Sequence, residues 1–342
     1  MTVAFGLLPL PDESTPDASR RRWGLREMAA HYAEFDEIEA IDSVWMGEGP
    51  PVGSMKGRSP GPEIMVRLAA VAAITRRVRL GVACMASFPT RDPLYVAAQW
   101  ASLDHLAGPG RMVLIVCQGQ PRRYEGEERA WHIPWGKERV ARMEECMAVV
   151  RACWTQERLT YHGTYFDFDD LAYGPKPLTQ PHPPMYIAGN PPPAEEGAPV
   201  SGMVRRLARY ADGWQTTHVP VDIFERRWRE VQLALAAEGR DPSTFVANVY
   251  YNVCIADDAS GAFTEAKGWL ERFYGREMPR EEVDSWTAYG TPRDVVAKLK
   301  AYADAGATEF VIRITAHDQA AQTKRLIREV IPEFRTAAAT RR

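Results

Sequence analysis

Short apolar segments alternate along the chain with longer amphipathic ones. The segment at 112–117 is rich in Val and Leu/Ile and unrelieved by polar residues, which is typical of a strand buried on both faces of a parallel sheet. Seven further short segments read as strands. The predicted strands cover residues 3–8, 41–46, 78–83, 112–117, 185–188, 213–217, 246–255 and 310–314.

Between the predicted strands, apolar residues recur at steps of three and four. Leu25, Met28, Tyr32 and Phe35 have this spacing, which places them on one face of a helix. The predicted helices cover residues 23–40, 63–75, 93–106, 137–154, 203–211, 223–238, 262–273, 295–305 and 319–334. Eight strands that alternate with helices indicate an α/β fold, a single (β/α)8 TIM barrel, and we expect one domain over residues 1–342.

Some long stretches carry neither pattern. Residues 190–200 are rich in Pro and lie between a predicted strand and its helix, so we expect a loop insertion at the active site and not a domain linker. Residues 274–291 are expected to form a second loop insertion. Residues 336–342 are expected to form a frayed tail.

Composition narrows the choice of partners and compartment. Lys and Arg number 42 against 45 Asp and Glu, a net charge of −3, so no basic excess exists for a nucleic acid partner. The five Cys are widely spaced without a CxxC, which favours a reducing cytoplasm over a disulfide framework. We see no signal peptide and no apolar run near the ~18 residues of a membrane span, so we expect a cytoplasmic protein with no membrane partner.

The active sites of TIM barrels lie at the carboxyl ends of the strands, so the residues that follow each predicted strand are the candidates. They are moderately polar and include one carboxylate and two histidines. They comprise Glu48, Cys84, Gln118, Asn190, His218, Asn252 and His317. The chain has no nucleophile-elbow, P-loop or zinc motif, and its His residues lack ligand spacing, so no metal site is expected.

Several short motifs along residues 3–334 resemble one family in their order and spacing. They are DSVWM at 42–46, RLG at 79–81, PTRDP at 89–93, ASLDHL at 101–106, YIAG at 186–189, ADGW at 211–214 and GTP at 290–292. Each motif alone is weak. Together they resemble the luciferase-like flavin monooxygenase family, the superfamily of bacterial luciferase.

The resemblance implies a flavin-dependent monooxygenase that uses reduced FMN and oxygen to oxidise a small organic substrate. A separate flavin reductase would supply the reduced FMN, because no second nucleotide-binding motif is present. A sister branch uses the deazaflavin coenzyme F420 for hydride transfer without oxygen, and this is the alternative function. A third alternative is a non-catalytic relative that binds a flavin. The family also implies a homodimer built through outer helices.

The resemblance further implies which residues hold the cofactor. Gly189 and Asn190, together with Ser201 and Gly202, would grip the phosphate with backbone N–H groups, although Ser201 also suits a plain helix N-cap. Gln118 falls where bacterial luciferase has an Arg near the phosphate, so that contact is weakened or replaced. The family's non-proline cis peptide, which supports the flavin ring, matches best around residues 83–85, that is at Ala83 and Cys84.

The catalytic candidates are Glu48, Cys117 and His218. Cys117 matches a position beside the flavin ring, or is an inert buried thiol. Glu48 would orient substrate, act as a base, or only pair with an arginine such as Arg91.

Two departures from the family bear on proton transfer. Gly49 replaces a His that many relatives carry, and Gln120 replaces a Glu proton donor of deazaflavin dehydrogenases. The loss of both groups argues against sugar-phosphate dehydrogenase chemistry. His218, or His132 in the loop after the fourth strand, could substitute, although a lone His is more often structural. The aromatic residues Tyr124, Trp131 and Trp135 of that loop would form a wall over the substrate, or pack on the barrel rim.

Overall fold

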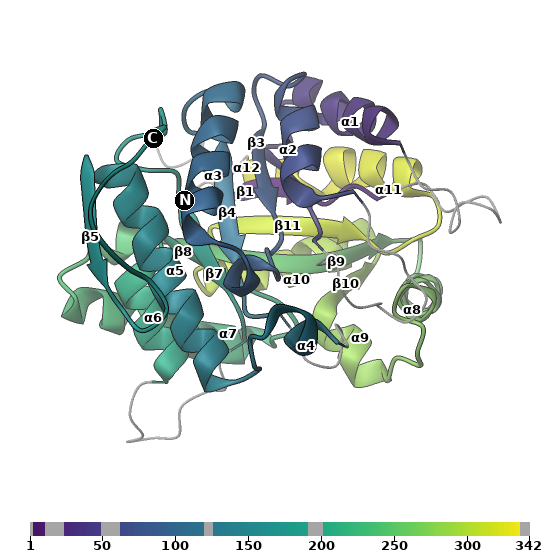
Figure 1. Cartoon of the computed structure of the whole chain (residues 1–342). Helices are drawn as coiled ribbons and strands as arrows, with labels where there is room; N and C mark the ends of the chain where they lie inside the picture. The colour runs from purple at the N-terminus through teal and green to yellow at the C-terminus, as the bar shows by residue number, and fades with distance from the viewer. Residues whose placement is uncertain (1–2, 11–23, 49–61, 120–125, 191–200, 336–342) are drawn as a thin grey trace, which may run out of the picture.

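A computed structural model describes residues 3–10, 24–48, 62–119, 126–190 and 201–335. In these residues eight parallel strands form a closed barrel with helices around it (Figure 1). The barrel strands, in their order around it, are β1 (Ala4–Leu7), β2 (Ser43–Met46), β3 (Arg79–Val82), β4 (Met112–Val116), β7 (Met185–Ala188), β8 (Gly213–Thr216), β9 (Val246–Ile255) and β11 (Glu309–Ile314). The pairing of β11 with β1 and of β8 with β9 closes the ring, and the predicted TIM barrel is confirmed.

Helices connect successive strands and cover the outside of the barrel, as the 3.6-residue periodicity predicts. They are α1 (Leu25–Ala33), α2 (Ile64–Ala72), α3 (Pro93–Ala107), α5 (Lys137–Thr155), α6 (Gly202–Tyr210), α7 (Val221–Ala237), α8 (Ala259–Tyr274), α10 (Pro292–Asp304) and α11 (Gln319–Arg325). The predicted final helix is interrupted by a π-helical segment, Leu326–Val330, before α12 (Pro332–Arg335). No helix in the described ranges is long and apolar enough to cross a membrane.

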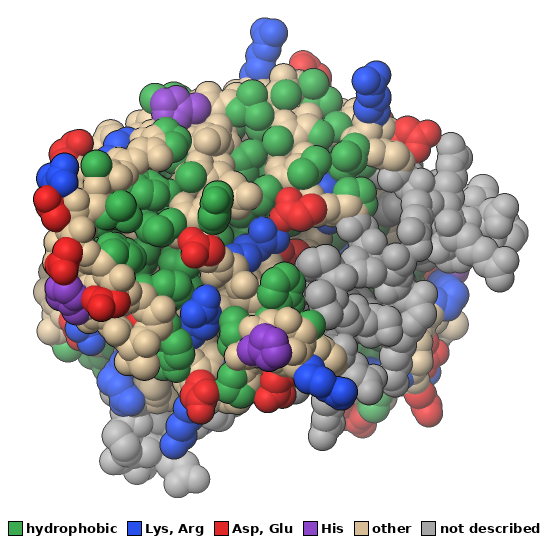
Figure 2. All heavy atoms as spheres, in the orientation of Figure 1, with side chains coloured by type: hydrophobic (Ala, Val, Ile, Leu, Met, Phe, Trp, Pro, Cys, Tyr) green, Lys and Arg blue, Asp and Glu red, His purple; other side chains and the backbone are tan. Residues whose placement is uncertain are grey.

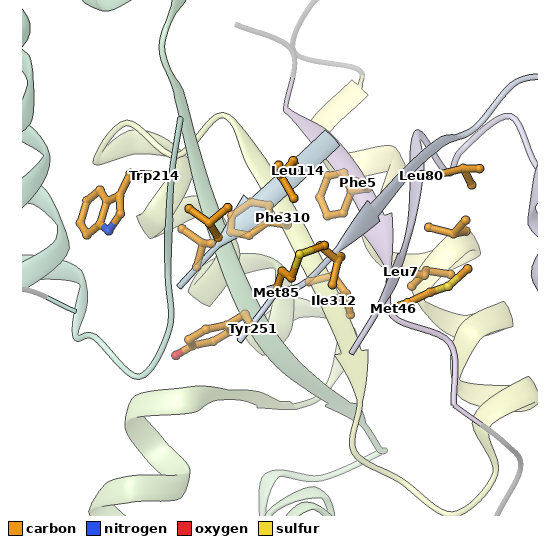
Figure 3. Packing of buried hydrophobic residues seen from close by; sticks show 14 of the residues in the cluster. Phe5, Leu7, Met46, Leu80, Met85, Leu114, Trp214, Tyr251, Phe310 and Ile312 are labelled. Atoms are coloured by element: carbon orange, nitrogen blue, oxygen red, sulfur yellow. The ribbon is translucent and has the colours of Figure 1, made fainter. Parts of the chain in front are cut away.

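The main hydrophobic core lies between the outer face of the barrel and the helices. Side chains alternate along each strand, so every second residue points outward. Phe5 and Leu7 of β1 and Phe310 and Ile312 of β11 point this way and are almost fully buried (Figure 3). Because both faces of each strand are covered, the strands appear in the sequence as apolar runs.

The other residues of each strand fill the inside of the barrel. On β11 these are Glu309, Val311 and Arg313, and on β9 their neighbours are Asn248, Tyr250 and Asn252. The middle of the interior is an apolar cluster that includes Val311, and the two ends are polar. That cluster comprises Leu8, Trp45, Val113, Ile115, Tyr186 and Val311.

The amino-terminal end of the barrel holds a buried polar network. The Arg79 Nη2 atom lies 2.5 Å from the Glu309 Oε1 atom, and Asn248 Nδ2 donates to Glu309 Oε2 over 2.8 Å. Gln215 Nε2 then donates to Asn248 Oδ1 over 3.0 Å. These contacts satisfy the almost fully buried Glu309, Asn248 and Gln215, so the network belongs to the stability of the fold.

The loop expected at 274–291 contains secondary structure, which corrects that prediction. Helix α9 (Arg280–Trp286) runs directly into β10 (Thr287–Gly290), and β10 pairs in parallel with residues 252–255 of β9. Strand β10 has only four residues and mixed polarity, so it gives no periodic signal. We refer to α8, α9 and β10 together as the rim excursion.

A hairpin outside the barrel was also not predicted. Strands β5 (Arg158–His162) and β6 (Asp167–Ala172) pair antiparallel beside α5, in a stretch of mostly polar residues. Leu159 and Tyr161 of β5 and Phe168 and Leu171 of β6 pack against the core, and β5 alternates between exposed and buried or half-buried residues over only five positions. The expected loop at 191–200 and the tail at 336–342 lie outside the described residues.

Candidate active site

The carboxyl ends of the barrel strands converge on one mouth, and two groups of side chains lie there. Cys84 and Cys117, which follow β3 and β4, form one group. His218, Asn252 and Arg313, from β8, β9 and β11, form the other. In the order of the strands, β4 and β11 lie on opposite sides of the barrel, so the two groups face each other across the mouth.

The two thiols are in direct contact. The Cys84 Sγ atom lies 2.7 Å from the Cys117 Sγ atom, and the peptide bond between Ala83 and Cys84 is cis, as the family resemblance implies. Beyond this bond the chain continues beside β4, where Met85 N donates to the Ile115 carbonyl over 2.6 Å. The thiol–thiol contact, followed by burial, raises the pKa of Cys117 well above its ordinary value. Cys117 is therefore a neutral thiol near pH 7 and not a nucleophile.

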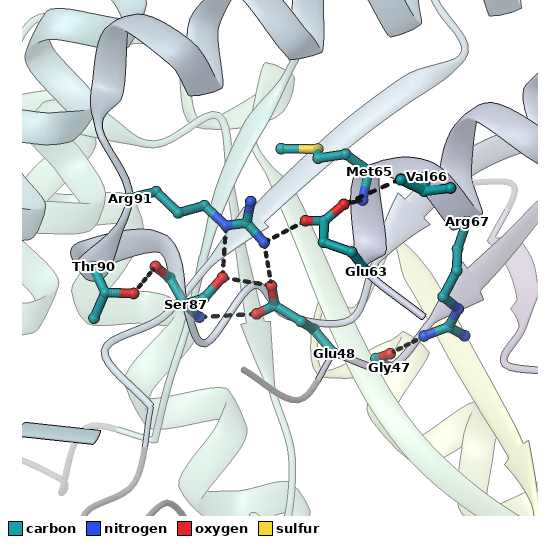
Figure 4. Close-up of polar contacts among 9 residues, drawn as sticks. All are labelled: Gly47, Glu48, Glu63, Met65, Val66, Arg67, Ser87, Thr90 and Arg91. Carbon is teal, nitrogen blue, oxygen red and sulfur yellow. Dashed lines mark hydrogen bonds and ion pairs between the residues drawn. The ribbon is translucent and has the colours of Figure 1, made fainter. Parts of the chain in front are cut away.

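Glu48 is held by an ion-pair network behind the mouth (Figure 4). Its side chain is 3% exposed and accepts from Ser87 N over 2.8 Å, from Ser87 Oγ over 2.5 Å and from Arg91 Nη2 over 3.1 Å. Arg91 Nη2 also lies 2.6 Å from Glu63 Oε1, at the start of α2. The pairing with Arg91 is the structural alternative considered above, and it places Glu48 as an anchor of the loop after β3. A catalytic role for Glu48 stays a prediction.

The predicted phosphate site lies at the start of α6, where Ser201 has a structural role and the binding of phosphate stays a prediction. Ser201 is the N-cap of α6, since its Oγ accepts from Val204 N over 3.3 Å. The first N–H groups of this helix, beginning at Gly202, face the carboxyl end of the barrel, where an anion would find donors and a favourable helix dipole. Gly189 lies close to α6, because a Cβ atom there would come within 2.7 Å of Met203 Cε.

Asn190 connects the ends of two strands. Its Oδ1 atom accepts from Thr216 Oγ1 over 2.9 Å and from Thr217 N over 3.1 Å. The side-chain oxygen is thus used to join β7 to β8, which leaves the amide nitrogen for a cofactor. The cofactor contacts predicted for Asn190, Gly189, Ser201, Gly202, Ala83, Cys84 and Gln118 stay predictions.

Gln118 is exposed and lies in a surface depression beside the mouth. Lys137 and Arg206 line the same depression, together with Glu144, whose Oε1 lies 2.7 Å from Arg206 Nε. Lys137 opens α5 and Arg206 lies in the second turn of α6, so both cations stand at the carboxyl end of the barrel. The charge missing from Gln118 is therefore present nearby on Lys137 and Arg206.

His218 follows β8 in a left-handed conformation, with φ of 54°. Its ring centroid lies 3.2 Å from that of Trp286 in α9. Burial, followed by the nearby Arg313 and Arg276, lowers the pKa of His218 to about 3. The imidazole is neutral at physiological pH and a weak proton acceptor, so the structure favours a hydrogen-bonding role for it.

Arg313 is a candidate that the sequence analysis missed. It is 2% exposed and lies inside the mouth on β11. Its Nε donates to Asn252 Oδ1 over 2.8 Å and its Nη1 to the Tyr274 hydroxyl over 3.0 Å. The signal was a single Arg in the apolar segment FVIRI, at a position that a period of two directs into the barrel.

The aromatic loop after β4 packs on the rim. Trp135 lies under Arg139, whose Cζ is 3.9 Å from the ring centroid, and a Cβ on Gly119 would come within 3.3 Å of the same ring. Trp131 and His132 are exposed at the end of the short helix α4 (Glu127–Trp131). Trp135 thus packs on the barrel rim, which is the structural alternative given above. Tyr124, Gly49 and Gln120 lie outside the described residues.

Among the described residues, no group of three or more His, Cys, Asp or Glu side chains could hold a metal ion. The mouth instead offers the two contacting thiols of Cys84 and Cys117 on one side. On the other side it offers a neutral imidazole and a buried guanidinium surrounded by aromatic rings. Such a mixture suits the binding of a flat aromatic cofactor and an organic substrate.

Comparisons with known proteins agree with this fold. A family profile described as luciferase-like monooxygenase matches residues 12–309. An F420-dependent glucose-6-phosphate dehydrogenase of Kineococcus radiotolerans is 26% identical over 328 residues, which cover 90% of this chain and 92% of that protein.

Two solved structures have the same architecture. The monooxygenase RslO1 from Streptomyces bottropensis has a TM-score of 0.76 at 21% identity, with 97% of this chain and 99% of that one covered. An F420-dependent secondary alcohol dehydrogenase, in complex with an F420-acetone adduct, has a TM-score of 0.76 at 17% identity, with 98% and 99% covered. At these identities the two structures support the fold alone.

Proposed function

The chain belongs to the luciferase-like monooxygenase family and is an oxidoreductase, and we propose that it transfers hydride with coenzyme F420. The observation that carries this proposal is the match to the F420-dependent enzyme of Kineococcus radiotolerans, which extends over nine-tenths of both chains. This favours the alternative of the sequence analysis over its main reading, the FMN monooxygenase. When bound, F420 would accept or donate a hydride on its ring without oxygen.

The residues of the mouth fit such a cofactor. The start of α6 and the cations Lys137 and Arg206 would bind its phosphate. Cys84 and Cys117 would pack against the ring as polarisable groups, and a high pKa keeps Cys117 protonated. Glu48 would hold Ser87, and with it the loop that carries Cys84, in place.

We propose that the substrate is not glucose 6-phosphate, the substrate in the name of the Kineococcus enzyme. The family positions that would provide the His and the Glu of sugar-phosphate dehydrogenases carry Gly49 and Gln120. Neither side chain can donate or accept a proton as an acid or base. We therefore propose a small organic substrate other than a sugar phosphate.

A reduced-FMN monooxygenase is the second candidate. It is favoured by the state of two titratable groups at the mouth: His218 has a pKa of about 3, and Cys117 stays protonated. Removing a hydride from an alcohol calls for a base near neutral pH, and these groups do not provide one. Oxygen and a separate flavin reductase would then be the partners.

Cofactor binding separates the two candidates. Purified protein is titrated anaerobically with F420 and with FMN, each oxidised and reduced, while the absorbance and fluorescence of the cofactor are followed. We expect F420 to bind at least about tenfold more tightly than FMN in either state. Tight binding of reduced FMN without binding of F420 would instead establish the second candidate, and binding of a cofactor without any turnover would favour a non-catalytic relative.

A pair of variants in α6 tests whether the cofactor phosphate binds at the start of this helix. Arg206→Gln removes a charge from the depression beside Gln118 and should weaken cofactor binding about tenfold, the value of one charge-assisted contact. Arg209→Gln is the matched control, since Arg209 is in the same helix and lies over Tyr210. Equal affinities in the two variants would place the phosphate elsewhere.

A further inference from the structure

The geometry points to a binding site for an organic carboxylate at Arg313, on the side of the mouth opposite the two cysteines, and we propose that the substrate carries this group. The inference rests on the proposed function only in taking the mouth as the active site. It applies equally to an F420 enzyme and to an FMN enzyme.

The first argument is the charge of Arg313. Arg313 donates to the Asn252 oxygen and the Tyr274 hydroxyl and also interacts with the Tyr250 side chain, and none of these partners is a carboxylate. No ion pair joins Arg313 to an Asp or Glu of the described residues, although the side chain is almost fully buried. A buried cation of this kind is costly unless an anion joins it.

The second argument is a concentration of unused hydrogen-bond donors. Arg313 Nη2, Asn252 Nδ2 and Trp286 Nε1 are all buried and have no partner. Asn252 is bonded directly to Arg313, and the Arg313 Cζ atom lies 4.6 Å from the centroid of the Trp286 ring. Thr287 Oγ1 is also unpartnered, and Thr287 pairs with Asn252 across β9 and β10. Donors without acceptors require a ligand that accepts, and a carboxylate accepts through both oxygens.

The charge balance selects a monoanion. His218 is neutral, and Arg276, the other nearby cation, is paired with Glu282, with 2.9 Å between Arg276 Nη1 and Glu282 Oε2. The site thus has one uncompensated positive charge. A carboxylate matches this charge, whereas a phosphate dianion would need a second cation.

The surroundings of Arg313 indicate an apolar body for the ligand. The centroids of four further rings lie 4.9–5.5 Å from Arg313 Cζ. They belong to Tyr250, Trp269, Phe273 and Tyr274. These rings surround the guanidinium at cation–π distance, and its Nη2 atom has no hydrogen-bond partner among the described residues. An aryl or alkyl carboxylate therefore suits the site better than a sugar.

The test compares anionic and neutral probes of the same shape. Binding of phenylacetate and phenylacetamide, and of the smaller pair acetate and acetamide, is measured by calorimetry on the full-length protein. We expect each carboxylate to bind about ten- to a hundredfold more tightly than its amide, as for a hydrogen bond to a charged group. Arg313→Gln should remove this preference. The control Arg272→Gln, at an exposed arginine of α8 that donates to His317, should keep it.

Two outcomes would overturn the inference. One is equal affinity for the acid and the amide in the unaltered protein. The other is a loss of F420 or FMN affinity in Arg313→Gln with the carboxylate preference intact, because Arg313 would then serve an anionic group of the cofactor. Cofactor binding is measured separately. A negative result of the carboxylate titration therefore leaves the proposed function standing, and a negative result of the F420 titration does not affect the carboxylate titration.

Discussion

The indole of Trp45 lies across the backbone of Gly81, so close that a Cβ atom on Gly81 would come within 2.2 Å of Trp45 Cζ3. On its other side the same indole meets Gly6, where a Cβ would lie 2.4 Å from Nε1. Nε1 donates to Ser43 Oγ over 2.8 Å. One fully buried tryptophan on β2 therefore fills the barrel between β1 and β3, and both neighbouring strands need glycine beside it.

Gly81→Ala should destabilise the protein by overpacking, by about 1–3 kcal/mol. The new methyl group would meet a ring that is fully enclosed and has no room to move. The free energy of unfolding from urea titrations measures the effect. Gly268→Ala is the control: it lies inside α8, where the nearest atom would be the end of Arg272 at 3.4 Å, and the change should be neutral or stabilising. Equal effects of the two substitutions would contradict this account of Trp45.

Glu309→Ala should cost about 3–5 kcal/mol of stability, because it leaves the partners Arg79 and Asn248 without their shared carboxylate. Thermal unfolding checks the value. The exposed Glu333, which pairs with Lys300, provides the control, and Glu333→Ala should change stability by less than about 1 kcal/mol. Cofactor affinity should stay unchanged in the folded variant, since the network lies at the end of the barrel away from the mouth.

His218 should make the protein lose stability in mild acid. Its pKa is about 3 in the folded chain and near 6.5 when unfolded, so below about pH 6.5 the unfolded chain takes up a proton that the folded chain does not. Stability should then fall by up to about 1.4 kcal/mol per pH unit between pH 6 and pH 4.

The measurement is the pH dependence of the unfolding free energy in two variants. His218→Asn should flatten this dependence. His132→Asn should not, and it is a matched control because both histidines have φ near +55°, which Asn tolerates. Parallel pH curves for the unaltered protein and His218→Asn would exclude His218 as the cause.

Cys117 should react slowly with iodoacetamide at pH 8, because its thiolate is scarce. Cys84→Ala removes the main cause of the raised pKa and should accelerate alkylation of Cys117. The rate is measured by mass spectrometry of the peptide that contains Cys117. Cys254→Ala, a buried thiol elsewhere, should leave the rate unchanged. Fast alkylation of the unaltered protein would show that Cys117 ionises readily.

The predicted homodimer would use an exposed apolar surface on α2 and α3. Hydrophobic side chains gather on this face of the molecule (Figure 2), and Val66, Ile74, Tyr95 and Leu106 of these helices and their ends are 48–73% exposed. Tyr95→Glu should convert a dimer into a monomer in light scattering coupled to size exclusion. Leu233→Glu, on α7 and 68% exposed, should not. A monomer at all concentrations in the unaltered protein would rule out the homodimer.

The barrel could be predicted because its strands are apolar on both faces and its helices are amphipathic, so each signal is local. Strand β10 could not, since its place depends on pairing with β9, far away in the sequence. The same holds for the site. Glu48 and Cys117 could be placed at strand ends from the sequence, and their roles stay predictions. Arg313 has no motif around it, and it is recognised only by neighbours on β9 and α9 that the fold brings together.

Strand β9 continues for ten residues, pairing first with β8 and then with β10, while β11 follows it on the other side. Strand β10 of the rim excursion is therefore bonded to the barrel by a main-chain ladder, unlike a hinged flap. We expect residues on this side of the mouth to keep their spacing when a ligand binds. The substrate specificity of this side of the mouth should therefore be altered by replacing individual side chains. Replacing the whole segment between 256 and 291 would remove the pairing of β10 with β9.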